Sequence, residues 1–167
     1  FRSIKNLDRK VLFIAILLLI SWSAYYPFQY NATNYYAVDL FNTDPDDTDS
    51  QSYKKGVGYG MLMLCLNNIV TLVSGFFNQK FIDRFGPKIP YAFAQITECA
   101  IFVGAIFYAK IDNEQTRLYV ATILFALVGL SQNIFNIVPY TIVGLSVPKA
   151  QMGMVMGALN IFVVSGQ

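Results

Sequence analysis

The sequence predicts an all-α fold, a polytopic bundle of helices within a membrane. Of its 167 residues, 55% are hydrophobic and only 13% are charged, and the mean hydropathy is +0.46. A soluble domain carries about 25% charged residues, so a soluble fold is excluded. Long runs have no charge or almost none: residues 11–38, 56–79, 118–148 and 150–167, and 89–109 with only Glu98. Because about 20 apolar helical residues cross the hydrocarbon layer, most of these runs have membrane length.

Taken in order, these runs predict five membrane helices in one partial transmembrane domain, residues 1–167. The spans lie near residues 10–30, 56–77, 89–109, 118–145 and 153–167. The last run would rise only about 22 Å as a helix, so this span is incomplete, and we expect the chain to be part of a longer protein. Between the first two spans, the run DPDDTDSQS predicts an acidic, turn-rich outer loop over residues 39–55.

The basic residues indicate which end of the bundle faces the cytoplasm or an equivalent inner compartment, because inner connections carry the excess of Lys and Arg. Eight bases fall on the side of the N-terminal end and four on the opposite side. The eight are Arg2, Lys5, Arg9, Lys10, Lys80, Arg84, Lys88 and Lys149, and the four are Lys54, Lys55, Lys110 and Arg117. The N-terminal end is therefore predicted to lie inside. Plasma, vacuolar and mitochondrial inner membranes all remain open.

Composition also excludes several classes of function. A net charge of +2 without a cluster of Arg and Lys argues against a nucleic-acid binder, which needs many cations on one face. The chain has no histidine, and its two cysteines, Cys65 and Cys99, fall inside predicted spans as packing residues. We therefore predict no metal site and no cofactor. Since no constellation of nucleophile, base or metal ligands is present, an enzyme is not expected, and the lipid bilayer is the first predicted partner.

Aromatic and amide side chains are mixed at the end of the first span, in the run SWSAYYPFQYNATNYY. Trp22, Tyr26, Gln29 and Asn34 suit a sugar, because aromatic rings stack on the apolar faces of sugars while amides pair with hydroxyl groups. An aromatic belt at the membrane interface explains such a mixture without a ligand, and the sequence leaves both interpretations open.

A second group of amides lies in the fourth span, shortly before Pro139. Gln132 and Asn136 are four residues apart and therefore share one helical face. An amide in hydrocarbon is costly unless it is paired, so this face is expected to meet another helix or a water-filled cavity. Contact between helices is the more ordinary explanation for a single amide, whereas a cluster beside a proline favours the lining of a cavity.

Glu98 is the only acid or base deep within a predicted span. A carboxyl group in that position suits a site that binds and releases a proton during transport. The alternative is a protonated structural acid that is hydrogen-bonded to Gln95, three residues earlier.

The second connection, FIDRFGPKIP, places Asp83, Arg84, Gly86 and Lys88 in a tight turn on the predicted inner side. It resembles the D-R-x-G-x-K/R core of the signature loop of the major facilitator superfamily, although the leading glycine of that motif falls at Gln79. The resemblance implies that the carboxylate and the cations pair with neighbouring helix ends and hold an inner gate in one arrangement. The positive-inside rule alone explains a basic turn, but not the ordered Asp-Arg-Phe-Gly run.

Four segments are also similar to the second half of sucrose/proton symporters and related glycoside transporters. In chain order they are ATNYYAVDLFNTDP (32–45), YKKGVGYGMLML (53–64), VPYTIVGLS (138–146) and GMVMGALNIFVVSGQ (153–167). The resemblance implies spans seven to ten and part of span eleven of a twelve-span transporter. Two acidic positions of the family are Ala32 and Asn34 here, its arginine position is Val38, and Asp39 keeps the following acid.

The same resemblance implies secondary active transport of a sugar or similar small polar organic solute by alternating access, with protons as the candidate coupling ion. Glu98 and Asp39 are then the candidate proton sites. The remainder of the transporter chain, or other membrane subunits, is the expected protein partner. Loss of the charged positions leaves one alternative open, in which the protein is a non-transporting structural membrane subunit of a larger complex.

Overall fold

The structure, a computed structural model, describes residues 9–167, and every regular element in that range is a helix. The elements are α2 (Arg9–Tyr35), η1 (Tyr36–Leu40), α3 (Gln51–Phe85), α4 (Lys88–Tyr108), α5 (Glu114–Ser146), η2 (Lys149–Gln151) and α6 (Met152–Gly166). η1 is a π-helical turn that continues α2, and η2 is a short 3₁₀ helix. The expected all-α fold is confirmed. Arg2 and Lys5, which contribute to the predicted orientation, lie outside the described residues.

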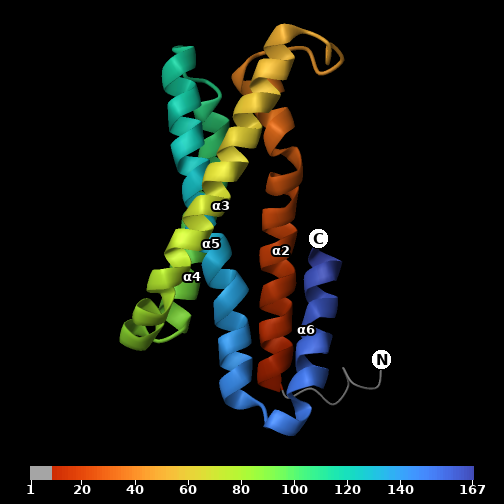
Figure 1. The fold of residues 1–167 in the computed structure, drawn as a ribbon, viewed down its shortest axis with the longest axis vertical. Coiled ribbons are helices and arrows are strands. Elements are labelled where there is room, and N and C mark those ends of the chain that lie inside the picture. Colours follow the sequence, from red (N-terminus) through yellow and green to blue (C-terminus); the bar gives the residue numbers. More distant parts are fainter. Residues whose placement is uncertain (1–8) are drawn as a thin grey trace.

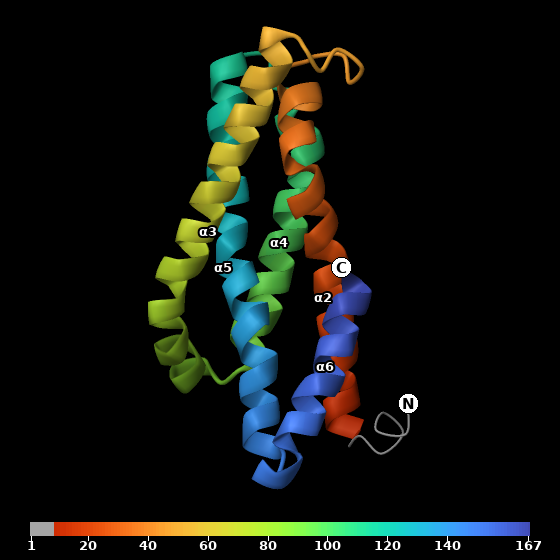
Figure 2. The same cartoon turned by 45° about the vertical axis from the view of Figure 1, so that its right-hand side comes forward.

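The helices form an elongated bundle in which α3 and α4 both pack against α5 (Figure 1). The turned view in Figure 2 shows α6 lying along α2, with which it makes its main contact. α6 ends beside the middle of α2, where Gly166 approaches Leu19 and Trp22. The α2–α3 link lies at one end of the bundle, and the α3–α4 and α5–α6 links lie at the other (Figure 1). Successive long helices therefore run in opposite directions.

Four helical segments are long and apolar enough to cross a membrane: Arg9–Leu40, Gln51–Phe85, Lys88–Tyr108 and Glu114–Ser146. The first continues well past its predicted end, because Tyr36 and Leu40 are buried and extend the packed helix through η1. The non-helical link is therefore confined to residues 41–50, shorter than the predicted loop over 39–55. Asp39 consequently lies in η1 rather than in a loop.

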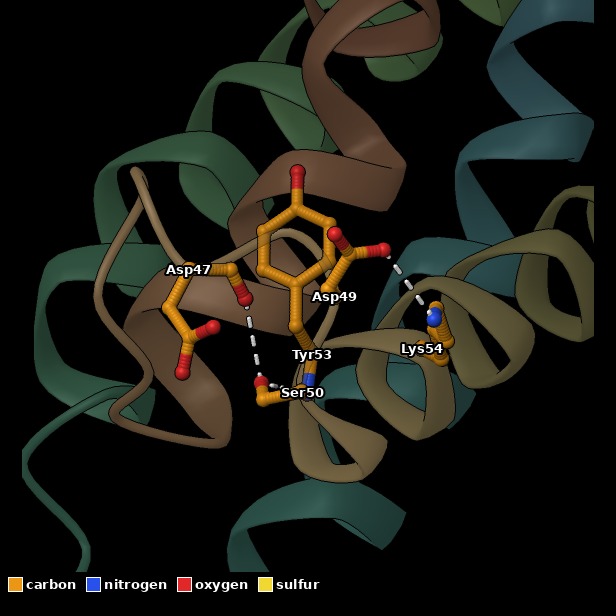
Figure 3. A network of polar contacts seen from close by, with 5 residues as sticks. All are labelled: Asp47, Asp49, Ser50, Tyr53 and Lys54. Carbon is orange, nitrogen blue, oxygen red and sulfur yellow. Dashed lines mark hydrogen bonds and ion pairs between the residues drawn. The ribbon is translucent and has the colours of Figure 1, made fainter.

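A cap at Ser50 explains why α3 begins earlier than predicted. The Ser50 hydroxyl accepts a hydrogen bond from the Tyr53 main-chain N–H at 3.2 Å and donates one to the Asp47 carbonyl oxygen at 3.1 Å (Figure 3). An N-cap of this kind satisfies a main-chain donor that the first helical turn leaves unpaired. The nearby Lys54–Asp49 ion pair, at 3.3 Å, is largely exposed to solvent and contributes little to stability.

Two clusters of buried side chains hold the bundle together. In the first, the rings of Tyr25 on α2 and Phe135 on α5 lie 5.4 Å apart. In the second, Leu18, Val143 and Leu159 join α2, the end of α5 and α6. Because lipid tails are as apolar as these side chains, close packing favours the contacts more than removal from water does.

α3 and α5 approach each other closely at Gly129. A Cβ atom on Gly129 would overlap the Asn67 carbonyl oxygen and lie 2.8 Å from Thr71 Oγ1. The short distance also permits polar contacts between the helices: Thr71 Oγ1 lies 3.1 Å from the Gly129 carbonyl oxygen, and Asn67 Nδ2 donates to the Phe125 carbonyl oxygen at 3.0 Å. A small residue at this position is therefore a condition of the α3–α5 contact.

We expect Gly129→Ala to destabilise the protein although alanine is the better helix former. Because the overlapped atom belongs to the α3 main chain, relief of the overlap is expected at the upper end of about 1–3 kcal/mol, above the gain of about 1 kcal/mol in helix propensity. Gly144→Ala on the same helix is the matched control, because a Cβ there meets nothing within 4 Å. Thermal unfolding of the full-length protein in detergent measures both variants. Equal midpoints for the two variants would contradict the assigned close approach.

Candidate functional site

The contacts that α5 makes with α2 and with α3 show which way the predicted amides on α5 point. The Phe135 ring points toward α2, whereas Asn133 points toward α3, where its Nδ2 donates to a main-chain carbonyl oxygen at 2.5 Å. At about 100° per residue, Gln132 and Asn136 both lie between these two directions. Both side chains are half-buried. α5 therefore presents the predicted pair to the region between α2 and α3.

α2 turns two predicted residues toward the same region. Tyr25 is buried and points into the bundle, whereas Thr33 faces α3 at Gly60. Trp22 and Gln29 lie between these directions on the helix, and Gln29 is exposed. Beyond the contact at Gly60, the α3 ribbon diverges from α2, as Figure 1 shows, and Tyr25 still reaches Asn67 of α3 with a hydrogen bond of 3.2 Å.

Helical phase thus turns four of the six predicted solute-contact residues of α2 and α5 toward one region, and the surface that they form is here called the amide face. Its members are Trp22, Gln29, Gln132 and Asn136. Tyr26 lies at the edge of this surface, where its ring stacks on Tyr30 with the centroids 6.4 Å apart. Asn34 lies away from the amide face, near the start of α3, and accepts a hydrogen bond from the Tyr53 hydroxyl at 3.5 Å.

Hydrogen bonds distinguish the amides that join helices from those that are available to a ligand. Asn133 is occupied by its contacts with α3, and the Gln132 Oε1 accepts from Thr71 Oγ1 at 2.8 Å. Among residues 9–167, the side chains of Gln29 and Asn136 have no hydrogen-bond partner. Contact between helices therefore explains Asn133 in full and Gln132 in part, and it leaves Gln29 and Asn136 free to meet a polar solute.

The predicted gate turn has a conformation that requires glycine. Gly86 has φ 70° and ψ 167°, a region that is essentially closed to residues with a Cβ atom. Its N–H donates to the Ile82 carbonyl oxygen at 2.8 Å and closes the end of α3. Pro87 follows and precedes the first residue of α4. The glycine of the signature motif therefore has a structural reason in the turn itself.

The charged residues of this turn are all exposed. Asp83 accepts a hydrogen bond from Gln79 Nε2 at 2.8 Å, and the Arg84 guanidinium lies 5.4 Å from the centre of the Phe85 ring. Within the part of the chain that the structure describes, neither these two residues nor Lys88 forms an ion pair. The ion-pair network that the resemblance implies thus stays a prediction.

The two candidate proton sites occupy different environments. Glu98 is only 3% exposed, and neither of its carboxyl oxygens has a hydrogen-bond partner in the described residues. The hydrogen bond that the sequence suggested between Glu98 and Gln95 is not formed: the Gln95 Nε2 has no acceptor among residues 9–167, and the Gln95 Oε1 accepts from Ser21 Oγ at 3.2 Å. Asp39, by contrast, is exposed in η1.

Arg117 lies near Asp39 but is used to close helix ends. Its side chain is buried and donates to the Ile111 carbonyl oxygen at 3.1 Å and to the Leu40 carbonyl oxygen. A cation at the carboxyl end of a helix is favoured by the helix dipole. Arg117 therefore ties the end of η1 to the start of α5.

Two apolar hollows lie away from the amide face. One, of about 490 Å³, lies between α3, α4 and α5 and is lined mainly by phenylalanine and aliphatic side chains. The other, of about 810 Å³, lies near the predicted inner ends of α2, α4 and α5. Neither includes a member of the amide face. Their apolar walls suit hydrocarbon chains better than a polar solute.

Two supporting residues could not be singled out from the sequence. Tyr25 and Thr71 hold α2 and α5 against α3, through hydrogen bonds to Asn67 at 3.2 Å and to Gln132 at 2.8 Å. In the sequence, the only feature that marks Tyr25 and Thr71 is a hydroxyl group within a predicted span. Among residues 9–167, no group of three or more His, Cys, Asp or Glu side chains could hold a metal ion.

Comparison with known proteins identifies the family. A profile described as Major Facilitator Superfamily matches residues 2–167. Sucrose transport protein SUC3 of Arabidopsis thaliana is 26% identical over 183 residues, which cover 99% of this chain and 31% of the relative. Sucrose transport protein SUC4 of the same plant is 23% identical and covers 100% of this chain and 35% of its own length. For sucrose transport protein SUT1 of Oryza sativa subsp. japonica, the values are 23%, 99% and 34%.

The chain spans about a third of the length of these curated relatives. No solved structure matches it significantly. The resemblance to sucrose transporters is confirmed, and the alignments cover 99–100% of this chain. Identities of 23–26% show that the proteins are related but do not show which solute this chain's protein carries. The family match and the four membrane-length apolar helices both indicate a membrane protein. The chain belongs to the major facilitator superfamily and is part of an integral, multi-pass membrane protein.

Proposed function

We propose that the protein containing this chain is a secondary active transporter that carries a sugar or a similar small polar organic solute by alternating access. The observation that carries the proposal is the amide face, which combines the half-buried indole of Trp22 with the amides of Gln29 and Asn136, unpaired among residues 9–167. An indole offers an apolar surface to the carbon face of a sugar, and free amides offer both donors and acceptors to its hydroxyl groups.

The relatives support the same solute class, since those compared are named for sucrose transport. By the resemblance, α2 and α5 are spans seven and ten, which line the solute pathway in this family. The amide face lies on these two helices. The N-terminal end of α2 then faces the inner compartment, in line with the excess of bases at that end. Rocking of the two halves of the carrier would expose the face alternately.

The first test is uptake of labelled sucrose and labelled glucose by the full-length protein in proteoliposomes. We expect saturable uptake of at least one sugar, and competition between the labelled and the unlabelled form. Protein that is folded and inserted but takes up neither sugar would contradict the proposed solute class. In that case a structural membrane subunit becomes the better description.

A second prediction concerns the amide face. Asn136→Leu should raise the KM for the transported sugar about 2- to 10-fold, because one amide–hydroxyl hydrogen bond contributes about 0.5–1.5 kcal/mol. Gln115→Leu on the same helix is the control, since Gln115 is exposed and pairs only with Tyr119 at 3.4 Å. Initial uptake rates over a range of sugar concentrations measure both variants. The assignment fails if Asn136→Leu and Gln115→Leu have the same KM.

A third prediction concerns the gate turn. Arg84→Ala should slow the cycling of the empty carrier more than it weakens solute binding, because a gate residue stabilises one arrangement of the helices rather than the solute. Lys80→Ala, one turn earlier on α3, is the matched loss of a cation. Loss of about 1.4 kcal/mol of gate stabilisation corresponds to a fall of about 10-fold in net uptake. We expect a fall of this size for Arg84→Ala but not for Lys80→Ala, with little change in the affinity for solute in either variant. Unchanged turnover would remove Arg84 from the gate.

A further inference from the structure

A second polar site is buried between α2, α4 and α5, away from the amide face. Glu98 projects from the buried side of α4, in line with Pro90, Ala94 and Ile101. It is 3% exposed, and both of its carboxyl oxygens are buried without a hydrogen-bond partner in the described residues. The Gln95 Nε2, less than one turn earlier, is likewise a buried donor without an acceptor. Two adjacent polar groups are thus enclosed without being paired.

The site lies beside a hydrogen-bonded contact between α2 and α4. Ser21 Oγ on α2 is 2.7 Å from the Tyr91 hydroxyl and donates to Gln95 Oε1 at 3.2 Å. One turn further along α2, the Tyr25 hydroxyl donates to Asn67 on α3 at 3.2 Å. The enclosure of Glu98 therefore depends on α2 keeping its place against α4.

Among residues 9–167, the groups that face Glu98 include no cation to balance a carboxylate. Tyr25 from α2 and Tyr91 from α4 are the titratable side chains that interact with it electrostatically. The facing stretches of α2, α3 and α5, residues 11–38, 56–79 and 118–139, contain no Lys, Arg, Asp or Glu. A carboxylate buried without a counter-charge is so costly that the group takes up a proton instead.

A neutral carboxylic acid also fits the polar groups beside it. When it is protonated, Glu98 has one O–H donor and a carbonyl oxygen that can accept. The carbonyl oxygen is the type of acceptor that Gln95 Nε2 lacks. Separation of α2 from α4 would break both Ser21 contacts and admit water, into which the proton could leave. Proton occupancy and helix packing are thereby linked through the same few atoms.

We propose that Glu98 is a proton-binding site that is closed by the packing of α2 against α4 and opens when α2 moves. Its use as the coupling site of transport rests on the function proposed above. The binding of a proton favours the packed arrangement, and its release accompanies separation of the helices. The solute on the amide face and the proton at Glu98 would then share one moving element, α2, without touching each other.

The first experiment tests the proton directly and needs no solute. Infrared spectra of the full-length protein at neutral pH should contain the C=O band of a protonated carboxyl group. Glu98→Gln should remove this band, and Glu98→Asp should shift it, which provides a second variant if the first folds poorly. Glu114→Gln, at the exposed start of α5, is the control and should leave the band in place. A wild-type spectrum in which Glu98 contributes only carboxylate bands would overturn the proposal.

The second experiment tests coupling in proteoliposomes with an imposed pH gradient. The wild type should show uptake that the gradient accelerates several-fold, whereas Glu98→Gln should lose this acceleration and retain exchange of labelled for unlabelled sugar. Acceleration that persists in Glu98→Gln would overturn the coupling role. If the wild type transports no sugar, the proposed function fails on its own, and the infrared result still decides whether Glu98 binds a proton.

Discussion

The packing of α5 against α3 is the contact on which the rest of the arrangement depends. In hydrocarbon, each helix satisfies its own main chain, so helices associate through close approach and a few polar bonds. Gly129 permits the approach, and Asn67 and Thr71 supply bonds across it. With α5 placed in this way, its other sides are available to α2 and α4. A wider α3–α5 spacing would therefore displace the polar groups that α5 and α3 share, such as Gln132, Asn133 and Thr71.

The same contact decides what neighbouring amides do. Asn133 points toward α3 and is hydrogen-bonded to it, whereas Asn136, three residues later, points toward the region between α2 and α3. Two asparagines three residues apart thus acquire different roles from helical phase alone. The direction of the α5 residues in the amide face therefore follows from the packing of α5 against α3. The α5 residues of this face are consequently held by the α3–α5 contact, and a held side chain suits a surface that must position a solute.

The fold class was predictable because membrane-length runs without charge depend only on composition and on the rise of a helix. The helix ends were less predictable, since the extension through η1 follows from burial of Tyr36 and Leu40, a tertiary effect. Spacing correctly placed Gln132 and Asn136 on one face, but it could not indicate which neighbour that face meets. The pairing of Gln95 with Ser21 instead of Glu98 joins residues 74 positions apart, beyond the reach of local pattern.

The departures from the sucrose-transporter pattern acquire a physical meaning in this bundle. Ala32, at a position that is acidic in the pattern, is 2% exposed and packs where α2 meets Gly60 of α3. A carboxylate in that contact would be desolvated and would force the two helices apart. Alanine therefore places a close α2–α3 contact where the pattern has a charge. Under the proposal made above, the acid that serves transport is instead Glu98, which α4 supplies.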